Sequence, residues 1–335
     1  MAANDVDPNF PSQLYAGRKR MNQRIVGQFS TQYGRLQAEK RPGPGGLDIA
    51  IAGVPFDQGT FFDSVGQRLG PDQARAFSKR LWQADELTGQ APFDWCRIAD
   101  VGDAPVDVLN FEQSIRGISD FFARISAAGA APLAVGGDHT ITLLIMRGMV
   151  QAGVKVPMGM IHFDAHPDMR DEYNGSRINC ATGFRRAIEE GLIDPKRYIM
   201  IGIRSIGAIE NLDWARRQGV TVLTDDDCAA LGRQGVITRT REVVGAEPTF
   251  LSFDIDALNI AYVHGTQAPV PGELSVRDVK VIMRGLRNVD VIGADVVELL
   301  PALDPTGHTA ISTVHVAYEI LCLLAEARAN RKAAS

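Results

Sequence analysis

Six potential metal ligands stand in three short stretches of the chain, each directly after a run of apolar residues. They are His139 in Gly136-Gly137-Asp138-His139, Asp164, His166 and Asp168 in His162-Phe163-Asp164-Ala165-His166-Pro167-Asp168, and Asp254 and Asp256 in Ser252-Phe253-Asp254-Ile255-Asp256. Alternate residues of a strand project to the same face, so Asp164/His166 and Asp254/Asp256 can each direct both members of a pair at one point. These stretches predict a buried site for two divalent ions.

The charges and chemical types of the six ligands favour two ions over one. Four carboxylates and two neutral imidazoles supply four negative charges, which two divalent cations would cancel. Without metal, the carboxylates would repel one another and carry a large desolvation cost. A mixed Asp and His set without thiolate favours manganese, then nickel, with zinc, cobalt and iron as alternatives. It argues against a structural zinc site, which would usually contain cysteine.

Apolar runs alternate with helical patterns after an N-terminal arm of residues 1–45. We expect strands at 47–54, 97–101, 131–135, 157–163, 197–203, 220–223, 249–254 and 289–297, and helices at 111–128, 140–152, 183–190, 208–217, 275–286 and 312–327. This alternation predicts a three-layer α/β/α fold with a single, mainly parallel eight-stranded sheet, formed by one catalytic domain of residues 46–335. The three ligand-bearing stretches fall at carboxyl ends of strands, where such sheets bind ligands. The arm is expected to pack on the body or on a neighbouring subunit.

The composition excludes several classes of protein. A net charge of -5 and a pI near 5.7 do not supply the basic face that nucleic acid needs. No apolar run reaches the length of a membrane span, and no charged-then-apolar leader opens the chain. The four cysteines, Cys96, Cys180, Cys228 and Cys322, have neither metal-ligand nor redox spacing. We therefore expect a cytoplasmic protein that binds neither nucleic acid nor membrane.

Taken together, the three stretches resemble the ureohydrolase family of arginase, agmatinase and guanidinobutyrase, and its agmatinase-like branch most closely. Further matches are Gly-Val-Pro-Phe-Asp at 53–57, Arg68-Leu69-Gly70-Pro71, Gly183-Phe184-Arg185-Arg186-Ala187, Glu298 and Pro301, so the likeness covers nearly everything after residue 45. The resemblance implies an arginase-like fold and a hydrolase with two divalent metal ions per chain. In such a hydrolase, hydroxide held between the ions attacks a guanidinium carbon, an amine leaves, and urea or a substituted urea is released.

The resemblance also implies a role for each ligand. One ion would take His139, Asp164, Asp168 and Asp254, and the other Asp164, His166, Asp254 and Asp256, so that Asp164 and Asp254 bridge the ions. Glu298 matches the carboxylate that grips the guanidinium nitrogens, since a carboxylate suits that planar fork of donors. The alternative for Glu298 is a surface or helix-cap carboxylate. His162 is expected to be buried and hydrogen-bonded, in a structural or supporting role.

Several positions depart from the family pattern and concern proton transfer or the pocket mouth. Cys180 stands where relatives usually have the histidine often assigned to proton transfer, and a packed thiol is favoured over a reactive one because no basic residue adjoins it in sequence. His264 is a candidate replacement, because its pKa suits proton transfer at neutral pH, although a plain loop histidine is favoured. Phe61, Phe62 and Tyr262 would form an aromatic, substrate-binding mouth, or else pack in the core or in a subunit interface.

The pocket loops carry further changes that bear on the substrate. The segment 264–269 reads His-Gly-Thr-Gln-Ala-Pro where relatives usually have Pro-Gly-Thr-Gly-Thr-Pro, and Ser64-Val65-Gly66 replaces Arg-Pro-Gly. A small or N-alkylated guanidine or a biguanide, such as dimethylbiguanide, is therefore favoured over arginine, since an apolar wall stabilises each methylene by about 0.8 kcal/mol.

Three alternatives remain for the function of the chain. The first is an agmatinase or guanidinobutyrase proper. The second is a non-catalytic, structural subunit of a mixed oligomer. The third, a deacylase with one zinc ion, is disfavoured because the paired carboxylates describe two metals. The family implies a homo-oligomer, trimeric or hexameric, or a hetero-oligomer with a related subunit.

Overall fold

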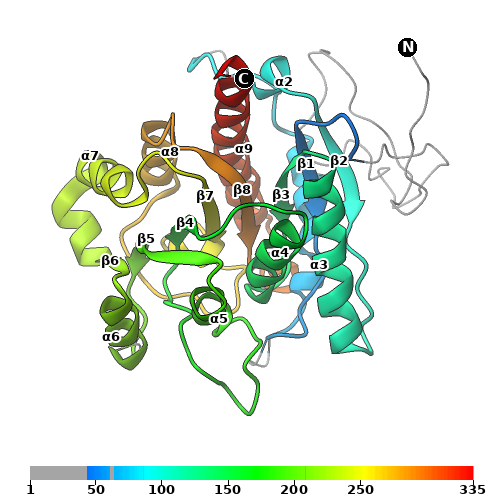
Figure 1. Ribbon diagram of the computed structural model, residues 1–335. Coiled ribbons are helices and arrows are strands. Elements are labelled where there is room, and N and C mark those ends of the chain that lie inside the picture. The colour runs from blue at the N-terminus through cyan, green and yellow to red at the C-terminus, as the bar shows by residue number, and fades with distance from the viewer. Residues whose placement is uncertain (1–43, 61–63, 86, 208, 335) are drawn as a thin grey trace.

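One parallel sheet forms the centre of the computed structural model, which describes residues 44–60, 64–85, 87–207 and 209–334 (Figure 1). Its strands are β1 (Ile49–Gly53), β2 (Ile98–Asp103), β3 (Ala131–Val135), β4 (Met158–Phe163), β5 (Ile193–Ile203), β6 (Thr221–Thr224), β7 (Thr249–Asp254) and β8 (Val291–Val297). The eight strands run in the order β2-β1-β3-β8-β7-β4-β5-β6, and all neighbours are parallel. The predicted fold class is confirmed.

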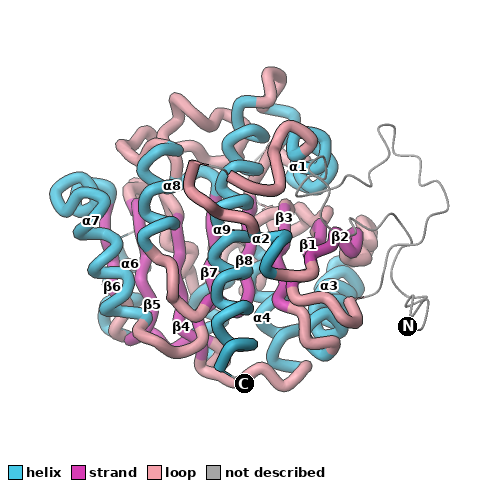
Figure 2. The backbone as a smooth tube through the Cα atoms, turned by 90° about the horizontal axis from the view of Figure 1, so that it is seen from above, coloured by secondary structure: helices cyan, strands magenta, loops and turns pink. Residues whose placement is uncertain are grey.

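Helices cover both faces of the sheet (Figure 2). One face is covered by α3 (Phe111–Ala127), α4 (Thr140–Gln151), α5 (Gly183–Glu189) and α6 (Ile209–Gln218). The other is covered by α1 (Gly70–Ser78), α2 (Pro92–Trp95), α7 (Asp225–Val244), α8 (Val276–Gly285) and α9 (His308–Ala334). Short 3-10 turns complete the described elements: η1 (Gln67–Leu69), η2 (Ile255–Ala257) and η3 (Pro301–Leu303).

Alternate residues of each strand divide the core between the two faces. In β4, Ile161 and Phe163 belong to the apolar cluster shared with α8 and α9, whereas Met160 belongs to the cluster shared with α3 and α4. Every residue of β4 is buried, as expected for a strand that is covered on both faces. The sheet is thus a rigid platform for the loops that leave its carboxyl edge.

The C-terminal helix α9 is a core element. It is long and apolar enough by composition to cross a membrane, yet 83% of its most apolar window is buried inside the fold. It packs on β8, α1 and α8, which explains why it is apolar around most of its circumference. It is also longer than the expected helix at 312–327 and extends beyond that range at both ends.

Three helices lie where the sequence pattern did not indicate them, namely α1, α2 and α7. The largest, α7, buries only six of its 20 residues and is interrupted at Gly232, whose φ of 63° and ψ of 173° are non-helical. It therefore has no continuous apolar stripe to detect. It begins with a capping box, in which Thr224 accepts from the Asp227 backbone and Asp227 accepts from the Thr224 backbone.

The strand boundaries agree with the expected ones to within two residues, except that β5 begins at Ile193 and not at Arg197. An irregularity in the pairing with β4 separates the Met158–Ile193 pair from the Met160–Tyr198 pair, so the first residues of β5 lack the regular apolar alternation. Residues 1–43 of the expected arm, and Phe61 and Phe62 of the expected aromatic mouth, lie outside the described residues.

Candidate metal centre and active site

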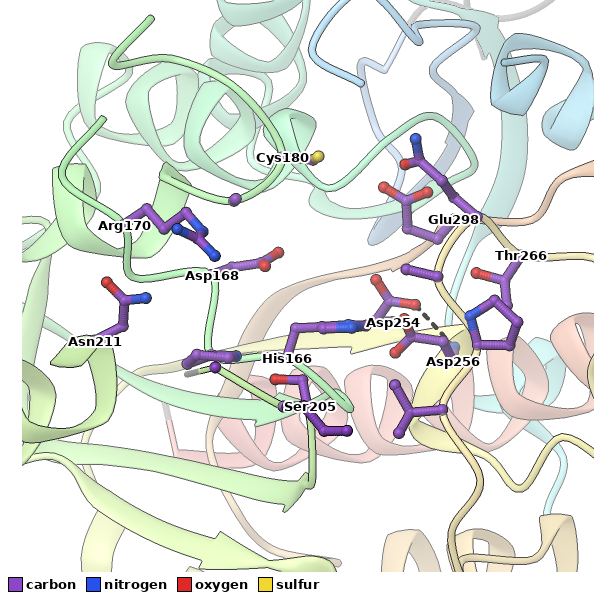
Figure 3. Close-up of a pocket in the computed structure, with 18 of the residues that line it drawn as sticks. His166, Asp168, Arg170, Cys180, Ser205, Asn211, Asp254, Asp256, Thr266 and Glu298 are labelled. Atoms are coloured by element: carbon purple, nitrogen blue, oxygen red, sulfur yellow. Dashed lines mark hydrogen bonds and ion pairs between the residues drawn. The ribbon is translucent and has the colours of Figure 1, made fainter. Parts of the chain in front are cut away.

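The six expected ligands converge at the carboxyl ends of neighbouring strands in the middle of the sheet. His139 is the N-cap of α4 and is separated from β3 by Gly136–Asp138, while Asp164, His166 and Asp168 follow β4, and Asp254 ends β7 with Asp256 in η2. Glu298 follows β8, which lies between β3 and β7. Figure 3 shows His166, Asp168, Asp254 and Asp256 directed into one cavity that Glu298 closes on the far side.

Two glycines explain how the chain turns from β3 into the helix that carries His139. Gly136 and Gly137 have φ values of 85° and 84°, in the left-handed region that favours glycine. A Cβ on Gly136 would lie 2.5 Å from Pro71, and one on Gly137 would lie 2.7 Å from the Val54 carbonyl oxygen. The adjacent Asp138 is a structural residue, because its carboxylate accepts from the backbone N–H groups of Gly59 and Thr140.

His139 faces three carboxylates in the buried inner part of the site. Its Nδ1 lies 3.1 Å from Asp164 Oδ2, 3.1 Å from Asp168 Oδ2 and 3.2 Å from Asp254 Oδ2. Burial opposes a charge on this imidazole, but the three carboxylates outweigh burial and raise the His139 pKa well above its ordinary value. The surroundings therefore favour positive charge at this point.

The hydrogen bonds around His139 leave Nδ1 available as a ligand. The Ser252 hydroxyl donates to Asp295 Oδ1 at 2.7 Å, so it accepts from His139 Nε2–H at 2.9 Å. Nδ1 then carries the lone pair, and it makes no hydrogen bond although it is buried. A lone pair that faces three carboxylates is repulsive unless a proton or a metal cation lies among them, so these residues fit a divalent ion that would take the place of the proton.

A second cluster shares Asp164 with the first. His166 Nδ1 lies 3.0 Å from Asp256 Oδ2 and 3.4 Å from Asp164 Oδ1. Burial alone would lower the His166 pKa, but the charges and hydrogen bonds of Asp256 and Asp164 outweigh burial and raise the pKa to about 12. Asp164, His166 and Asp256 can bring one ligand atom each to a common point. The two clusters thus offer two adjacent positions for cations.

Backbone donors hold the carboxylates of β7 and η2 in place. Asp254 Oδ1 accepts from the backbone N–H of Asp256 at 2.8 Å, and Asp256 Oδ1 accepts from that of Ala165 at 3.1 Å. In both carboxylates Oδ2 is left to face a histidine of the centre. Burial, followed by the charges of Asp256 and Asp164, raises the Asp254 pKa well above its ordinary value. This crowding of negative charge is what bound cations would relieve.

His162 contacts the candidate ligand Asp164 from within the sheet. It is buried within β4, where one ring nitrogen lies 2.8 Å from Asp164 Oδ2 and the other 2.8 Å from the Tyr198 hydroxyl. Its ring stacks on Phe184 with centroids 4.0 Å apart. With both nitrogens engaged, His162 orients Asp164, in agreement with the structural or supporting role expected for it.

Glu298 is a buried carboxylate at the wall of the cavity. Oε1 accepts from the backbone N–H of His139 at 2.8 Å, and Oε2 accepts from Gln67 Nε2 at 3.0 Å. Burial, and then the charge of Asp138, raise the pKa of Glu298 to about 8. Its φ of 66° is unusual for a residue with a side chain, and such strain is found where the surrounding structure fixes a functional conformation.

Two glutamines of this wall were missed from the sequence. Gln67 is fully buried, and its Nε2 lies 3.4 Å from Gln267 Oε1, which also accepts from Thr60 Oγ1 at 2.6 Å. Gln267 lines the cavity next to Glu298. Gln267 could have been found in the sequence, because it replaces the glycine that is usual at this position of the 264–269 loop. Gln67 could not, because its contact with Glu298 joins residues that are 231 positions apart.

The cavity measures about 630 Å³ and includes Cys180 in its wall. The Cys180 backbone N–H donates to Gly59 O at 3.2 Å. Burial, and then the charge of Glu298, raise the pKa of the Cys180 thiol well above its ordinary value. Cys180 is therefore a neutral, packed thiol at physiological pH, which is the interpretation that the sequence favoured.

Two expected pocket residues are not brought to this cavity. Tyr262 is 43% exposed, and neither it nor His264 is among the described residues that line the cavity. His264 is exposed, its backbone N–H donates to Thr309 Oγ1, and its ring lies 6.1 Å from that of His308. The loop turns both side chains outward, whereas the following residues, Thr266 and Gln267, face inward.

Known proteins agree with this architecture. Residues 47–323 match the model of the arginase family. Guanidinopropionase of Pseudomonas aeruginosa is 42% identical over 289 residues, which are 86% of this chain and 90% of that protein. Guanidinobutyrase of the same organism is 40% identical over 279 residues, or 83% of this chain and 86% of that protein. The structure of proclavaminate amidino hydrolase from Streptomyces clavuligerus superposes with a TM-score of 0.80 at 33% identity, covering 85% of this chain and 94% of that one.

The chain belongs to the arginase family, as the three ligand-bearing stretches indicated. It is a hydrolase that acts on C–N bonds of guanidino compounds. The resemblance to ureohydrolases is thereby confirmed, and the matched residues 47–323 include every strand of the sheet.

Proposed function

We propose that the chain is a binuclear-metal amidinohydrolase in which Mn²⁺, or next Ni²⁺, occupies both clusters. One ion is assigned to His139, Asp164, Asp168 and Asp254, and the other to Asp164, His166, Asp254 and Asp256. The observation that carries this assignment is the buried Nδ1 of His139, which faces three carboxylates without a hydrogen bond. When bound, such ions supply the positive charge that activates water as a nucleophile at neutral pH.

The chain's own residues would bind and orient the substrate. Glu298 would accept hydrogen bonds from the guanidinium nitrogens, since a carboxylate matches that planar set of donors. The positive charge of the guanidinium would lower the raised pKa of Glu298 and so favour its ionised form. The two fixed donors to Glu298, His139 N–H and Gln67 Nε2, prevent it from turning away from the cavity. We assign no proton transfer to Cys180, because its raised pKa keeps the proton on sulfur.

The distribution of charge in the cavity limits the substrate. The acids among its described lining residues are Asp168, Asp254, Asp256 and Glu298, all of which belong to the inner site. The outer wall is formed in part by the exposed or half-buried residues Ile206, Pro269, Val270 and Pro271. An ammonium group on the substrate tail, as in agmatine or arginine, would find no carboxylate among the described residues of that wall. We therefore favour a guanidino compound without a cationic tail.

Two substrate groups meet this condition. Small or N-alkylated guanidines and biguanides, including dimethylbiguanide, are the first candidates, because the apolar outer wall would stabilise alkyl substituents. Guanidino acids are the second, because relatives bear the names guanidinopropionase and guanidinobutyrase. Agmatine is expected to be a poorer substrate than either group.

The test is a substrate screen with the protein reconstituted separately with manganese and with nickel. Urea or substituted urea would be measured for guanidine, N-alkylguanidines, dimethylbiguanide, 3-guanidinopropionate, 4-guanidinobutyrate, arginine and agmatine, with metal content determined per chain. We expect about two ions per chain. Urea or substituted urea should be released from at least one guanidine whose substituent is uncharged or acidic. Asp164→Ala, which removes the ligand shared by both clusters, should lose both metal and turnover.

The alternative is a non-catalytic subunit of a mixed oligomer. Two bound ions without turnover on any guanidine or biguanide would favour this alternative, whereas turnover by the purified single chain would exclude it. We propose a cytoplasmic homo-oligomer, trimeric or hexameric, with a hetero-oligomer as the alternative. The four cysteines are all buried free thiols, in keeping with a reducing compartment.

A further inference from the structure

We infer that Arg170, assisted by Asn211, forms an anion subsite at the outer end of the cavity and binds a carboxylate on the far end of the guanidino substrate. This inference rests on the proposed function, which places the guanidinium at Glu298. Of the two substrate groups proposed above, it selects the second, the ω-guanidino acids, over the alkylguanidines and biguanides.

Arg170 is held in place by its backbone and by an aromatic neighbour. It lies in the loop between β4 and α5, and its backbone N–H donates to Ala181 O at 2.9 Å, next to Cys180 in the cavity wall. Its guanidinium carbon lies 5.2 Å from the centre of the Tyr173 ring. Tyr173 is itself fixed by a two-way backbone pairing with Ser176. The base of the side chain is therefore anchored while its charged end remains exposed.

The positive charge of Arg170 is not neutralised within the described part of the chain, where no ion pair to it is found. The neighbouring Asp171 is already engaged by other arginines, at 3.0 Å from Arg177, 3.5 Å from Arg185 and 2.7 Å from Arg186. Arg170 is also the single Lys or Arg among the described residues that line the cavity. An unpaired guanidinium at a cavity wall is a ready partner for a carboxylate, which it binds through two parallel N–H donors.

The two kinds of charge lie on opposite sides of the same cavity. Figure 3 shows Arg170 and Asn211 on one side and Glu298 on the other, with Asp168, His166 and Asp254 between them. Asn211 comes from the first turn of α6 and lines the cavity with Ser205, so a side-chain amide and a hydroxyl are available beside Arg170. A molecule with a guanidinium at one end and a carboxylate at the other matches this polarity, and a tail that ends in ammonium is repelled by it.

The test compares substrates that share a guanidinium and a chain length but differ in the carboxylate. Initial rates of urea release would be measured for 4-guanidinobutyrate and N-butylguanidine with wild-type protein, Arg170→Gln, Arg170→Lys and the control Arg177→Gln. Arg177 is exposed in the same loop but does not line the cavity. Binding of both compounds to the metal-loaded proteins would also be followed by calorimetry, which requires no turnover.

In Arg170→Gln, the KM for 4-guanidinobutyrate is expected to rise about tenfold, which corresponds to about 1.4 kcal/mol, with kcat nearly unchanged. The KM for N-butylguanidine should stay constant, Arg170→Lys should recover part of the loss, and Arg177→Gln should match wild type. An equal effect on both compounds, or a wild-type preference for N-butylguanidine or dimethylbiguanide over the acid, would overturn the subsite. Arg170-dependent binding without urea release would keep the subsite and overturn the proposed function.

Discussion

At the scale of single residues, the centre depends on side chains that never touch the reacting groups. Ser252 links His139 to Asp295. The Ser252 hydroxyl donates a hydrogen bond to Oδ1 of Asp295, whose side chain is fully buried. This chain of two hydrogen bonds selects the tautomer in which the lone pair of His139 Nδ1 is available for the proposed metal ion. Residues that orient metal ligands in this way commonly contribute a factor of about 10 to 100 in metal affinity.

Ser252→Ala should therefore weaken metal binding about 10- to 100-fold, because the His139 Nε2–H and Asp295 would lose their shared partner. The measurement is a competition titration of Mn²⁺ against a chelator. Ser312→Ala is the matched control, since Ser312 is also buried but bonds to a carbonyl of its own helix. Equal affinity in the Ser252 and Ser312 variants would show that the tautomer does not depend on this hydrogen bond.

At the scale of elements, one arginine joins the loops that leave three strands. Arg204 directly follows β5, its backbone N–H donates to Ala165 O at 3.0 Å, and its guanidinium donates to five carbonyls. These belong to Gly202, Asp256, Ala257, Leu258 and Val270. The Arg204 side chain thus holds the segment that carries the ligand Asp256 against the segment that forms the outer wall of the cavity.

Arg204→Lys keeps the charge but replaces a planar fork by a single ammonium group, which cannot reach this set of carbonyls. The free energy of unfolding should fall by about 2–4 kcal/mol, as expected for the loss of several hydrogen bonds from a charged donor. Urea unfolding of the metal-loaded protein measures this change. Arg216→Lys, at an arginine on the exposed face of α6, serves as control, and an Arg204 variant as stable as that control would contradict the role.

At the scale of the whole molecule, Asp48 connects the sheet to the C-terminal helix. It directly precedes β1, accepts from the Arg97 backbone N–H at 2.8 Å, and lies 2.7 Å from Lys332 Nζ near the end of α9. Burial alone would raise the Asp48 pKa, but the hydrogen bonds from Arg97 and Lys332 outweigh burial and lower the pKa below 3.8. The ionised form is thus favoured in the folded protein.

A carboxyl group whose pKa is lower in the folded protein stabilises the fold when the pH is above the pKa of the unfolded state. That contribution disappears as the pH falls through the pKa of the folded state. At neutral pH, Asp48→Asn should therefore lower the free energy of unfolding by about 1 kcal/mol. The difference from wild type should shrink between about pH 5 and pH 3. Urea unfolding at several pH values tests this dependence, with the exposed Asp120→Asn as control. A difference that stays constant with pH would contradict it.

Much of the site was predictable because its ligands are encoded locally. Asp164/His166 and Asp254/Asp256 are two residues apart at the ends of buried strands, which was enough to place each pair at one edge of the sheet. The alternation of side chains along a strand is not the reason, because Asp164 and His166 follow β4 and Asp256 lies in η2. The strand pattern was equally legible, since both faces of a parallel sheet are buried and its strands are continuously apolar. In contrast, α7 was not visible, because it lies mostly on the surface and is broken at Gly232.

The amino-acid sequence by itself determined the ligand types, their pairing and the sheet that carries them, because these depend on spacing and apolar period within short segments. Only the tertiary structure decided which other residues share the cavity. It brought Gln67 to Glu298 across 231 positions and Arg170 to the wall opposite Glu298, while it turned Tyr262 and His264 outward. The physical reason is that a loop's direction is set by long-range contacts such as those of Arg204, which leave no periodic signal in the chain.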